Sequence, residues 1–270
     1  QNWQKEIFKI KNKFIYLIQD YEPSFYNWST RYALAESTYH FPDSYIPVFN
    51  SSLLKDYFYN ENYKISNGLG FEPILNPELK KLRKNNFKEV RTKKILIYGR
   101  PSVDRNLFPI IVLALDEAMK SNIIKNWEIL SAGEEHSDIS LSNNKKIKSL
   151  GKLSLENYAK VMGESSVGIS LMLSPHPSYP PLEMAAYGMK VITNKFKNKD
   201  LSKYFNNIYS IEDCSPSTLA KKILEVCQII EFNNFLVKKE EIVMKEPFDN
   251  FLKSEDPIEN LKKDLLMKLL

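Results

Sequence analysis

Glu183 stands in a stretch where a run of apolar residues breaks into a proline-rich loop and then resumes as a short predicted helix. The stretch reads SLMLSPHPSYPPLEMAAYG from Ser170 to Gly188. Pro180 and Pro181 suit the first helical turn, where a missing N–H costs nothing, and a glycine suits the helix end. Open α/β sheets bind ligands where a strand feeds a loop and a helix start, because unpaired N–H groups face the crevice. We therefore expect Glu183 to lie near the helix start and to accept hydrogen bonds from sugar hydroxyls.

The loop before this helix offers further groups to a ligand. His176 lies between two prolines that restrict its backbone, and a histidine in a rigid surface loop is the alternative interpretation. Ser178 and Tyr179 supply hydroxyl groups, and the backbone from Ser178 onward supplies N–H groups suited to a phosphate. The predicted ligand contacts of this loop are His176, Ser178, Tyr179 and Pro180.

Two arginines follow the end of a second predicted strand. The run KKILIYGRPSVDRNL places Gly99 after aliphatic residues, with Arg100 next and Arg105 five positions further on. Glycine permits a tight turn at the strand end, and two guanidinium groups near a helix start can clamp a diphosphate through charge-assisted hydrogen bonds. Asp104 is expected to cap the next helix. For an arbitrary pair of arginines, two solvated residues at a helix start would be the alternative.

Two more residues follow predicted strand ends in the same half of the chain. Gly133, in the run SAGEEH, is expected to shape a turn near a nucleotide base. Lys152 follows the next strand end, where contact with the base and simple solvation are both open interpretations.

The N-terminal part carries a second set of candidates. Asp20, Tyr21 and Glu22 follow a predicted strand, and Trp28 and Arg31 lie near a predicted helix start. These residues are expected to contact an acceptor or a donor molecule, with packing between domains as the alternative, since aromatic-rich loops often supply such packing.

The elements that position these residues alternate between strands and helices. Such alternation favours an α/β fold with a parallel sheet covered by helices on both faces. In the C-terminal part we expect strands at 95–98, 127–132, 147–150, 166–171, 191–193 and 207–211, and helices at 107–120, 154–163, from 180 onward and at 217–230.

The N-terminal part contains fewer strand–helix units than a complete Rossmann-like domain needs. Strands are expected at 14–19 and 45–49, with a further one at 70–75, and helices at 29–39 and 51–59. The basic stretch 80–94 is interpreted as an interdomain linker. We predict an incomplete N-terminal domain over 1–88, a nucleotide-sugar-binding domain over 89–242 and a tail over 243–270, and we expect the chain to be a section of a longer polypeptide.

The composition excludes several classes of protein. Two cysteines in 270 residues are too few for a disulfide framework, and no run of about 18 to 20 apolar residues spans a bilayer. The net charge of +5 is carried by scattered basic residues, which argues against a nucleic-acid partner. No metal-ligand spacing, GxSxG elbow or phosphate-binding GxxxxGKS motif occurs, so we expect no metal and no cofactor. The predicted location is the cytoplasm, with peripheral association at the inner face of the membrane left open.

Together, the two C-terminal stretches resemble the donor-binding domain of GT-B glycosyltransferases, and within them the retaining family 4. That family ends its first strand in a Gly-Arg pair with a Lys or Arg five residues later, matched here by Gly99, Arg100 and Arg105. Its second motif is a pair of glutamates separated by seven residues; Glu183 matches the second, and Pro175 stands where the first would be. The variant loop, together with YGRPS, IQDYEP and WSTRYALAE, resembles a bacterial rhamnosyltransferase subfamily that builds surface polysaccharides.

The resemblance, which runs from about residue 14 to 227, implies two Rossmann-like domains and a retaining, metal-independent hexosyltransferase. The implied donor is dTDP-L-rhamnose and the implied acceptor is an oligosaccharide or a lipid-linked glycan. In that family the two cations, Arg100 and Arg105, face the donor diphosphate, and Glu183 holds the ribose. Two alternatives stay open: a non-catalytic nucleotide- or glycan-binding module, and a GT-B sugar-nucleotide epimerase.

The tail over 256–270 has leucines on one helical face and lysines off it. This pattern is shared by a helix docked on its own protein and by a helix lying on a membrane surface. Docking on the N-terminal domain is the favoured interpretation, because three lysines and an intervening aspartate make a weak electrostatic anchor.

Overall fold

The computed structural model of the protein describes residues 14–40, 45–65, 68–253 and 256–269. Contacts divide the chain into two units. The larger comprises Leu75–Leu173 and Ser178–Lys253, and the smaller comprises Gln1–Ile74, Ser174–Pro177 and Ser254–Leu270. The domain limits that the sequence suggests, at 88/89 and 242/243, stay a prediction.

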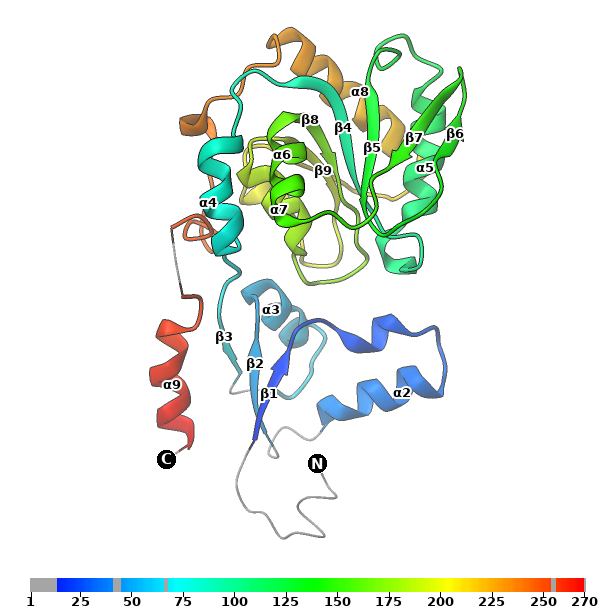
Figure 1. The fold of residues 1–270 in the computed structure, drawn as a ribbon. Helices are drawn as coiled ribbons and strands as arrows, with labels where there is room; N and C mark the ends of the chain where they lie inside the picture. The colour runs from blue at the N-terminus through cyan, green and yellow to red at the C-terminus, as the bar shows by residue number, and fades with distance from the viewer. Residues whose placement is uncertain (1–13, 41–44, 66–67, 254–255, 270) are drawn as a thin grey trace. The chain divides into compact units, whose positions relative to one another are not determined.

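The larger unit is built on a seven-stranded sheet with the order β10-β9-β8-β4-β5-β7-β6 (Figure 1). Every neighbouring pair is parallel except β6 and β7. The carboxyl ends of the parallel strands therefore meet at one edge of the sheet. The strands are β4 (Thr92–Gly99), β5 (Glu128–Gly133), β6 (Ile139–Leu141), β7 (Lys145–Ser149), β8 (Ser165–Ile169), β9 (Lys190–Asn194) and β10 (Ile208–Ile211).

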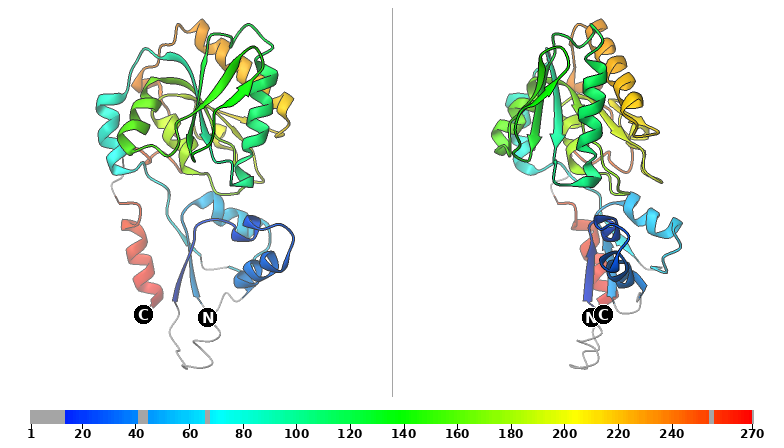
Figure 2. Two further views of the ribbon diagram at one scale, coloured as in Figure 1. Left: turned by 45° about the vertical axis from the view of Figure 1, so that its right-hand side comes forward. Right: turned by 90° about the vertical axis from the view of Figure 1, so that its right-hand side faces the viewer.

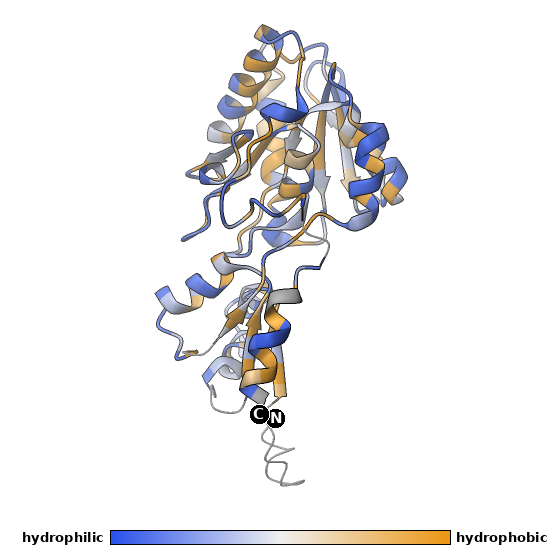
Figure 3. Ribbon diagram, turned by 90° about the vertical axis from the view of Figure 1, so that its left-hand side faces the viewer, coloured by the Kyte–Doolittle hydropathy of each residue, from blue (hydrophilic) through white to orange (hydrophobic). Residues whose placement is uncertain are grey.

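Helices cover both faces of this sheet, as the alternation of elements predicts (Figure 2). The helices α5 and α8 pack against each other on one face, and α4, α6 and α7 lie on the other. The strands between them are largely hydrophobic, whereas the helices carry both hydrophilic and hydrophobic residues (Figure 3). The bounds are α4 (Pro77–Asn86), α5 (Phe108–Ala118), α6 (Leu155–Glu164), α7 (Tyr179–Ala186) and α8 (Pro216–Phe232), with 3-10 turns η4 (Asp104–Asn106), η5 (Leu201–Lys203) and η6 (Lys239–Glu241).

The smaller unit contains a parallel three-stranded sheet with the order β1-β2-β3. Its strands are β1 (Phe14–Ile18), β2 (Tyr45–Phe49) and β3 (Leu69–Gly70), and its helical elements are η1 (Glu22–Phe25), α2 (Thr30–Ser37), η2 (Thr38–His40), α3 (Ser52–Asn60) and α9 (Glu259–Leu269). Ser29 and Ser51 cap α2 and α3 through their hydroxyl groups. The core is rich in aromatic rings, which pack edge to face as Tyr39 and Phe58 do at 4.8 Å between centroids.

One face of α9 is buried and another is exposed. Leu261 is 6% exposed, whereas Leu266 and Met267 are 61% and 71% exposed. This burial supports the docking of the tail within the smaller unit, which stays a prediction.

The stretch predicted to be an interdomain linker is largely structured. Helix α4 occupies its first half, because Asn76 caps the helix, Pro77 opens it and Leu79 is buried. Strand β4 already begins at Thr92. The linker prediction is therefore wrong, since a high density of lysines concealed an amphipathic helix.

Three further details differ from the expectation. Strand β3 covers only Leu69–Gly70, and the hairpin strand β6 was not expected. Asp104 does not cap α5: it opens the 3-10 turn η4, and α5 begins after Leu107, whose φ of 54° is left-handed and whose side chain makes no cap.

Arg91 ties several elements of the larger unit together at the amino edge of its sheet. The guanidinium Nη1 donates to the carbonyl oxygens of Met162 (2.9 Å) and Gly163 (2.7 Å), and Nη2 donates to that of Tyr187. Arg91 is 4% exposed and lies over the ring of Phe87 at 4.7 Å. Burial, with a smaller contribution from nearby Arg83, lowers the pKa of Arg91 to about 10. The ends of α6 and α7 thus share one buried cation.

We predict that Arg91→Met destabilises the protein by about 3 kcal/mol or more, because three buried carbonyl groups lose their donor at about 1 to 3 kcal/mol each. Urea unfolding followed by circular dichroism measures the loss. The control is Lys221→Met on the exposed side of α8, which should change the free energy of unfolding by less than about 0.5 kcal/mol. Equal stabilities for the two variants would contradict the role given to Arg91.

Candidate functional site

Strands β4 and β5 approach each other closely at their carboxyl ends. Gly99 pairs with Gly133, and Glu134 N donates to Gly99 O at 2.8 Å. A Cβ on Gly99 would lie 2.0 Å from Ser131 Oγ, and a Cβ on Gly133 would lie 2.5 Å from Gly99 O, in a backbone with φ of 144°. Only glycine fits at either position. Because Gly99 and Gly133 are paired, the two loops that follow them leave the sheet next to each other.

Glu134 holds the loop that carries Arg100. Its carboxylate accepts hydrogen bonds from Ser102 N (3.0 Å) and Ser102 Oγ (2.8 Å). These two donors, with a smaller contribution from the charge of Arg100, keep the pKa of Glu134 below its usual range. A neighbouring pair supports the same edge, since Ser131 Oγ lies 2.8 Å from His136 Nε2. Sequence reasoning gave neither Glu134 nor His136 a role; an acidic residue directly after a glycine at the adjacent strand end was the signal.

Arg105 lies in η4, against the loop that comes after β8. Leu173 N donates to Arg105 O at 2.9 Å, and the buried Asn106 donates through Nδ2 to Leu171 O at 3.3 Å. The loop with the two arginines and the loop that leads to α7 are therefore joined by hydrogen bonds. Arg100 and Arg105 are both half-buried.

Glu183 lies among tyrosines in the second turn of α7. The helix begins at Tyr179, one residue earlier than expected, with Ser178 before it, so Glu183 is its fifth residue. Burial raises the pKa of Glu183 to about 7, and the Tyr158 hydroxyl of α6 opposes part of that rise. The Glu183 charge in turn raises the pKa of Tyr158, Tyr179 and Tyr187, after burial as the main cause. Carboxyl groups with such shifts gather at functional sites.

Tyr158 is a neighbour of Glu183 that sequence reasoning missed. Its hydroxyl is buried and has no partner that meets hydrogen-bond geometry within the described residues. It sits in the first turn of α6, four residues after the cap Ser154. No local pattern marks this position, because the contact joins two helices that are distant in sequence.

The loop after β8 is held rigidly before it reaches α7. Met172 N donates to Asn194 Oδ1 (2.7 Å), and Met172 O accepts from Asn194 Nδ2 (3.1 Å) and from the buried Lys199 Nζ (2.7 Å). The polypeptide that approaches α7 is therefore anchored to β9 and to the loop beyond it.

Within the smaller unit, Ser174 joins the two remaining loop candidates. Its hydroxyl donates to Asp20 Oδ1 and accepts from His176 N at 3.0 Å. Asp20 Oδ1 also accepts from Tyr21 N at 2.8 Å. His176 is 6% exposed and groups with the smaller unit, unlike the other predicted donor contacts.

The other candidates of the N-terminal part lie in two different environments. Tyr21 is 7% exposed, and its hydroxyl lies 2.8 Å from that of Tyr63, so it belongs to the aromatic core. Glu22 begins η1, and Arg31 is exposed on α2. Trp28 is 89% exposed and stacks on Tyr32 at 4.8 Å between ring centroids.

The sheet topology gathers most of the predicted donor contacts at one edge of the larger unit. β8, β4, β5 and β7 are neighbours in the sheet. The loop after β8 leads to Tyr179 and Pro180 at the start of α7, β5 ends at Gly133, and Arg100 and Lys152 follow β4 and β7. Lys152 is exposed there, and Tyr179 is 38% exposed. Among the described residues, no three His, Cys, Asp or Glu side chains are grouped to hold a metal ion. Nor does any helix in that part of the chain have the length and apolar content to cross a membrane.

Solved structures identify the fold as GT-B. A glycosyltransferase from Rickettsia africae superposes with a TM-score of 0.56 at 19% identity, over 97% of this chain and 71% of its own. TarM superposes with a TM-score of 0.68 at 11% identity, over 98% of this chain and 52% of its own. HepE of Anabaena, solved with UDP and glucose, gives 0.62 at 13% identity, over 98% and 73% of the two chains. The fold is thus the one that the sequence predicted.

The family is more specific than the fold. The WsaF C-terminal domain model matches residues 93–224, and the WsaF N-terminal domain model matches residues 1–52. These matches together cover more than half of the chain, which therefore belongs to the WsaF family. The O-antigen biosynthesis protein RfbC of Myxococcus xanthus is 33% identical over 179 residues, which are 66% of this chain and 14% of that protein. The chain thus matches a small part of a much longer relative.

The raised pKa of Glu183 predicts a pH-dependent stability. A folded-state pKa of about 7, above the ordinary 4.5, contributes stability below pH 4.5 that is lost as the pH rises through 7. Glu183→Gln removes this loss, so the stability of the variant relative to the parent should rise by about 2 to 3 kcal/mol from pH 5 to pH 8. Urea unfolding at both pH values measures the difference.

Glu156→Gln is the matched control for this pH dependence. Glu156 is exposed at the start of α6, and hydrogen bonds from its own backbone N–H and from the Ser154 hydroxyl lower its pKa, so this variant should show no gain at pH 8. If Glu183→Gln shifts stability equally at both pH values, Glu183 is not the buried, partly protonated group inferred here.

Proposed function

We propose that this chain is the donor-binding part, with a portion of the acceptor part, of a retaining rhamnosyltransferase that uses dTDP-L-rhamnose. The observation that carries the proposal is the carboxyl edge of the larger sheet, where the close pair Gly99 and Gly133 sets Arg100 and the neighbouring η4 turn beside the loop to α7. Membership of the WsaF family supports rhamnose as the sugar. HepE, which shares the fold, was solved with UDP and glucose, which supports a nucleotide-sugar donor.

Arg100, Arg105 and the start of α7 are assigned to the donor diphosphate. In the proposed reaction, the bond from the anomeric carbon to the diphosphate oxygen breaks, and its electron pair leaves on the diphosphate. The acceptor hydroxyl oxygen bonds to that carbon on the same face, and its proton passes to the departing phosphate oxygen. Fixed positive groups stabilise the charge as it develops, so the chemistry needs neither a protein nucleophile nor a divalent cation.

Glu183 is assigned to hydroxyl groups of the nucleotide sugar. A buried carboxyl group that is half-ionised near neutral pH gains most from hydroxyl donors, because they stabilise its charged form. Gly133 and Lys152 are placed near the base, and Ser178, Tyr179 and Pro180 near the phosphates. We assign His176, Asp20, Glu22, Trp28 and Arg31 to the acceptor side, where an oligosaccharide or lipid-linked glycan would bind; the name of the O-antigen relative supports such an acceptor.

One residue favours a second candidate function. Pro175 stands where the resembling family has its first glutamate, and a proline side chain offers the donor sugar no hydrogen bond. A non-catalytic module that binds the nucleotide sugar would keep Arg100, Arg105 and Glu183 and would not need that glutamate. Transfer of rhamnose to an acceptor glycan, measured with and without EDTA, separates the two functions. Metal-independent transfer supports the enzyme, and binding without transfer supports the module.

The diphosphate assignment predicts the behaviour of two variants. Arg105→Ala and Arg100→Ala should each weaken dTDP binding by about 1.5 to 3 kcal/mol, the scale of a lost charge-assisted hydrogen bond, with the fold retained. Isothermal titration calorimetry measures the loss, and Lys221→Ala on the exposed side of α8 is the control. The assignment of Arg100 and Arg105 to the diphosphate is wrong if both variants bind dTDP as tightly as the parent.

The assignment of Glu183 predicts selective losses among ligands. Glu183→Gln should weaken UDP more than dTDP, since deoxyribose lacks the 2′-hydroxyl, and should leave inorganic pyrophosphate binding nearly unchanged. The same titrations test it. Equal losses of affinity for pyrophosphate and dTDP would mean that the carboxyl group stabilises helix α7 rather than binding the sugar hydroxyls.

A further inference from the structure

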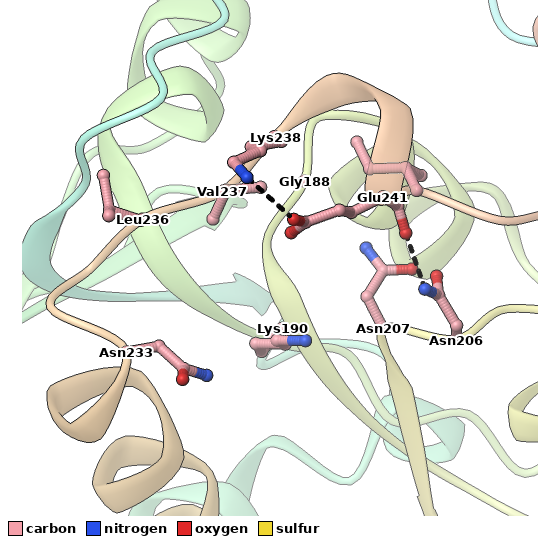
Figure 4. Close-up of a pocket in the computed structure, with 10 residues that line it drawn as sticks. Gly188, Lys190, Asn206, Asn207, Asn233, Leu236, Val237, Lys238 and Glu241 are labelled. Carbon is pink, nitrogen blue, oxygen red and sulfur yellow. Dashed lines mark hydrogen bonds and ion pairs between the residues drawn. The ribbon is translucent and has the colours of Figure 1, made fainter.

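A pocket of about 360 Å³ opens at the amino edge of the larger sheet, opposite the edge that carries Gly99 (Figure 4). Its volume lies at the lower end of the ~300–1,000 Å³ typical of small-molecule sites. Lys190, the first residue of β9, forms its floor, and the segment from the end of α8 to η6 closes one side. The lining residues are Gly188, Lys190, Asn206, Asn207, Asn233, Leu236, Val237, Lys238, Glu241 and Ile242.

The backbone around this pocket is firmly held. Asn206 Nδ2 donates to Glu241 O at 2.6 Å, and Asn206 Oδ1 accepts from Val243 N at 3.0 Å. Gly188 has a φ of 86°, and a Cβ there would lie 2.8 Å from Val237 Cγ1. The pocket is therefore a built feature of the fold, since specific contacts fix the wall that η6 contributes to it.

The charges in the pocket leave an excess of one positive group. Glu241 Oε1 lies 3.6 Å from Lys238 Nζ, and this ion pair is drawn in Figure 4. Lys190 is half-buried and has no carboxylate within 4.0 Å among the described residues. Burial lowers the pKa of Lys190, and the more distant charge of Glu241 opposes that effect only in part. An anion beside Lys190 would compensate for this burial.

Asn207 adds a hydrogen-bond acceptor without a partner. It is 4% exposed, and its Nδ2 donates to Ala185 O (2.8 Å) and Met189 O (2.9 Å), which fixes the orientation of the amide. Its Oδ1 is buried without a hydrogen-bond partner among the described residues. Such an acceptor requires a donor, and a hydroxyl group is one. The exposed side-chain amide of Asn233, which also lines the pocket, can form hydrogen bonds with further hydroxyl groups.

We propose that this pocket binds an anionic sugar, whose negative group lies beside Lys190 and whose hydroxyls bind the asparagine amides. The anion is either the phosphate of a free sugar phosphate or the carboxylate of a uronic acid residue in a glycan. Because Lys190 and Gly99 lie at opposite edges of the same parallel sheet, this site is separate from the one proposed for the nucleotide sugar.

The test is titration of the whole chain with glucose 6-phosphate, glucuronate, glucose and inorganic phosphate, each followed by calorimetry. At least one anionic sugar should bind saturably, and glucose and inorganic phosphate should bind at least about tenfold more weakly. The tighter of glucose 6-phosphate and glucuronate identifies the source of the anion. No saturable binding of either, or phosphate binding as tight as that of the best sugar, would overturn the proposal.

Variants locate the binding. Lys190→Met should weaken binding of the anionic sugar at least about tenfold. Lys190 is half-buried, so a second variant is made at the exposed Lys238 in case Lys190→Met does not fold, and Lys238→Met should also weaken binding of the anionic sugar. Lys221→Met is the matched control on the outer side of α8 and should bind as the parent does. Saturating dTDP should leave the affinity unchanged. Displacement by dTDP, or unchanged binding in both folded lysine variants, would place the sugar elsewhere.

Discussion

The buried guanidinium of Arg91 is the interaction on which the candidate site depends. The last carbonyl groups of a helix have no partner within the helix and form the negative end of its dipole. Arg91 is 4% exposed and satisfies such groups at the ends of α6 and α7 at once. Because α6 carries Tyr158 and α7 carries Glu183, one cation at the amino edge of the sheet sets the separation of two side chains further along these helices. The positions of Tyr158 and Glu183 therefore depend on contacts at the opposite edge of the sheet.

Desolvation raises the pKa of Glu183 and so reduces the negative charge at one end of the site. Glu183 has a pKa of about 7 because α6 and α7 exclude water around it. The arginine loops differ, since Arg100 and Arg105 are half-buried and the carboxylate that holds their loop, Glu134, has a pKa below its usual range. The site thus combines an electropositive end, suited to phosphates, with an end that is close to neutral and suited to hydroxyl groups. A nucleotide diphosphate sugar has the same division between its charged and its hydroxyl-bearing parts.

The sequence predicted the parallel sheet, the helices on both its faces and the loops that leave its carboxyl edge, because these depend on local periodicity and on glycine and proline. It failed where a contact joins distant segments. Tyr158 meets Glu183 only when α6 and α7 pack together, and Glu134 reaches Ser102 only when β4 and β5 pair. The mistaken linker shows the reverse problem: the lysines of α4 are locally typical of a loop, and the burial of Leu79 that makes it a helix depends on tertiary packing.

Helix α7 connects the two edges of the larger unit. It begins beside the loop tied to Arg105, carries Glu183 in its second turn and leads through Tyr187 to Gly188, which lines the pocket at the opposite edge. Asn207 holds its last turn through Ala185 O, and Arg91 holds Tyr187 O. A ligand that donates to Asn207 Oδ1 leaves the two bonds from Asn207 Nδ2 to Ala185 O and Met189 O in place, so it does not release the last turn of α7. The position of Glu183 is therefore set by protein contacts at both ends of this eight-residue helix, whether or not the pocket holds a ligand.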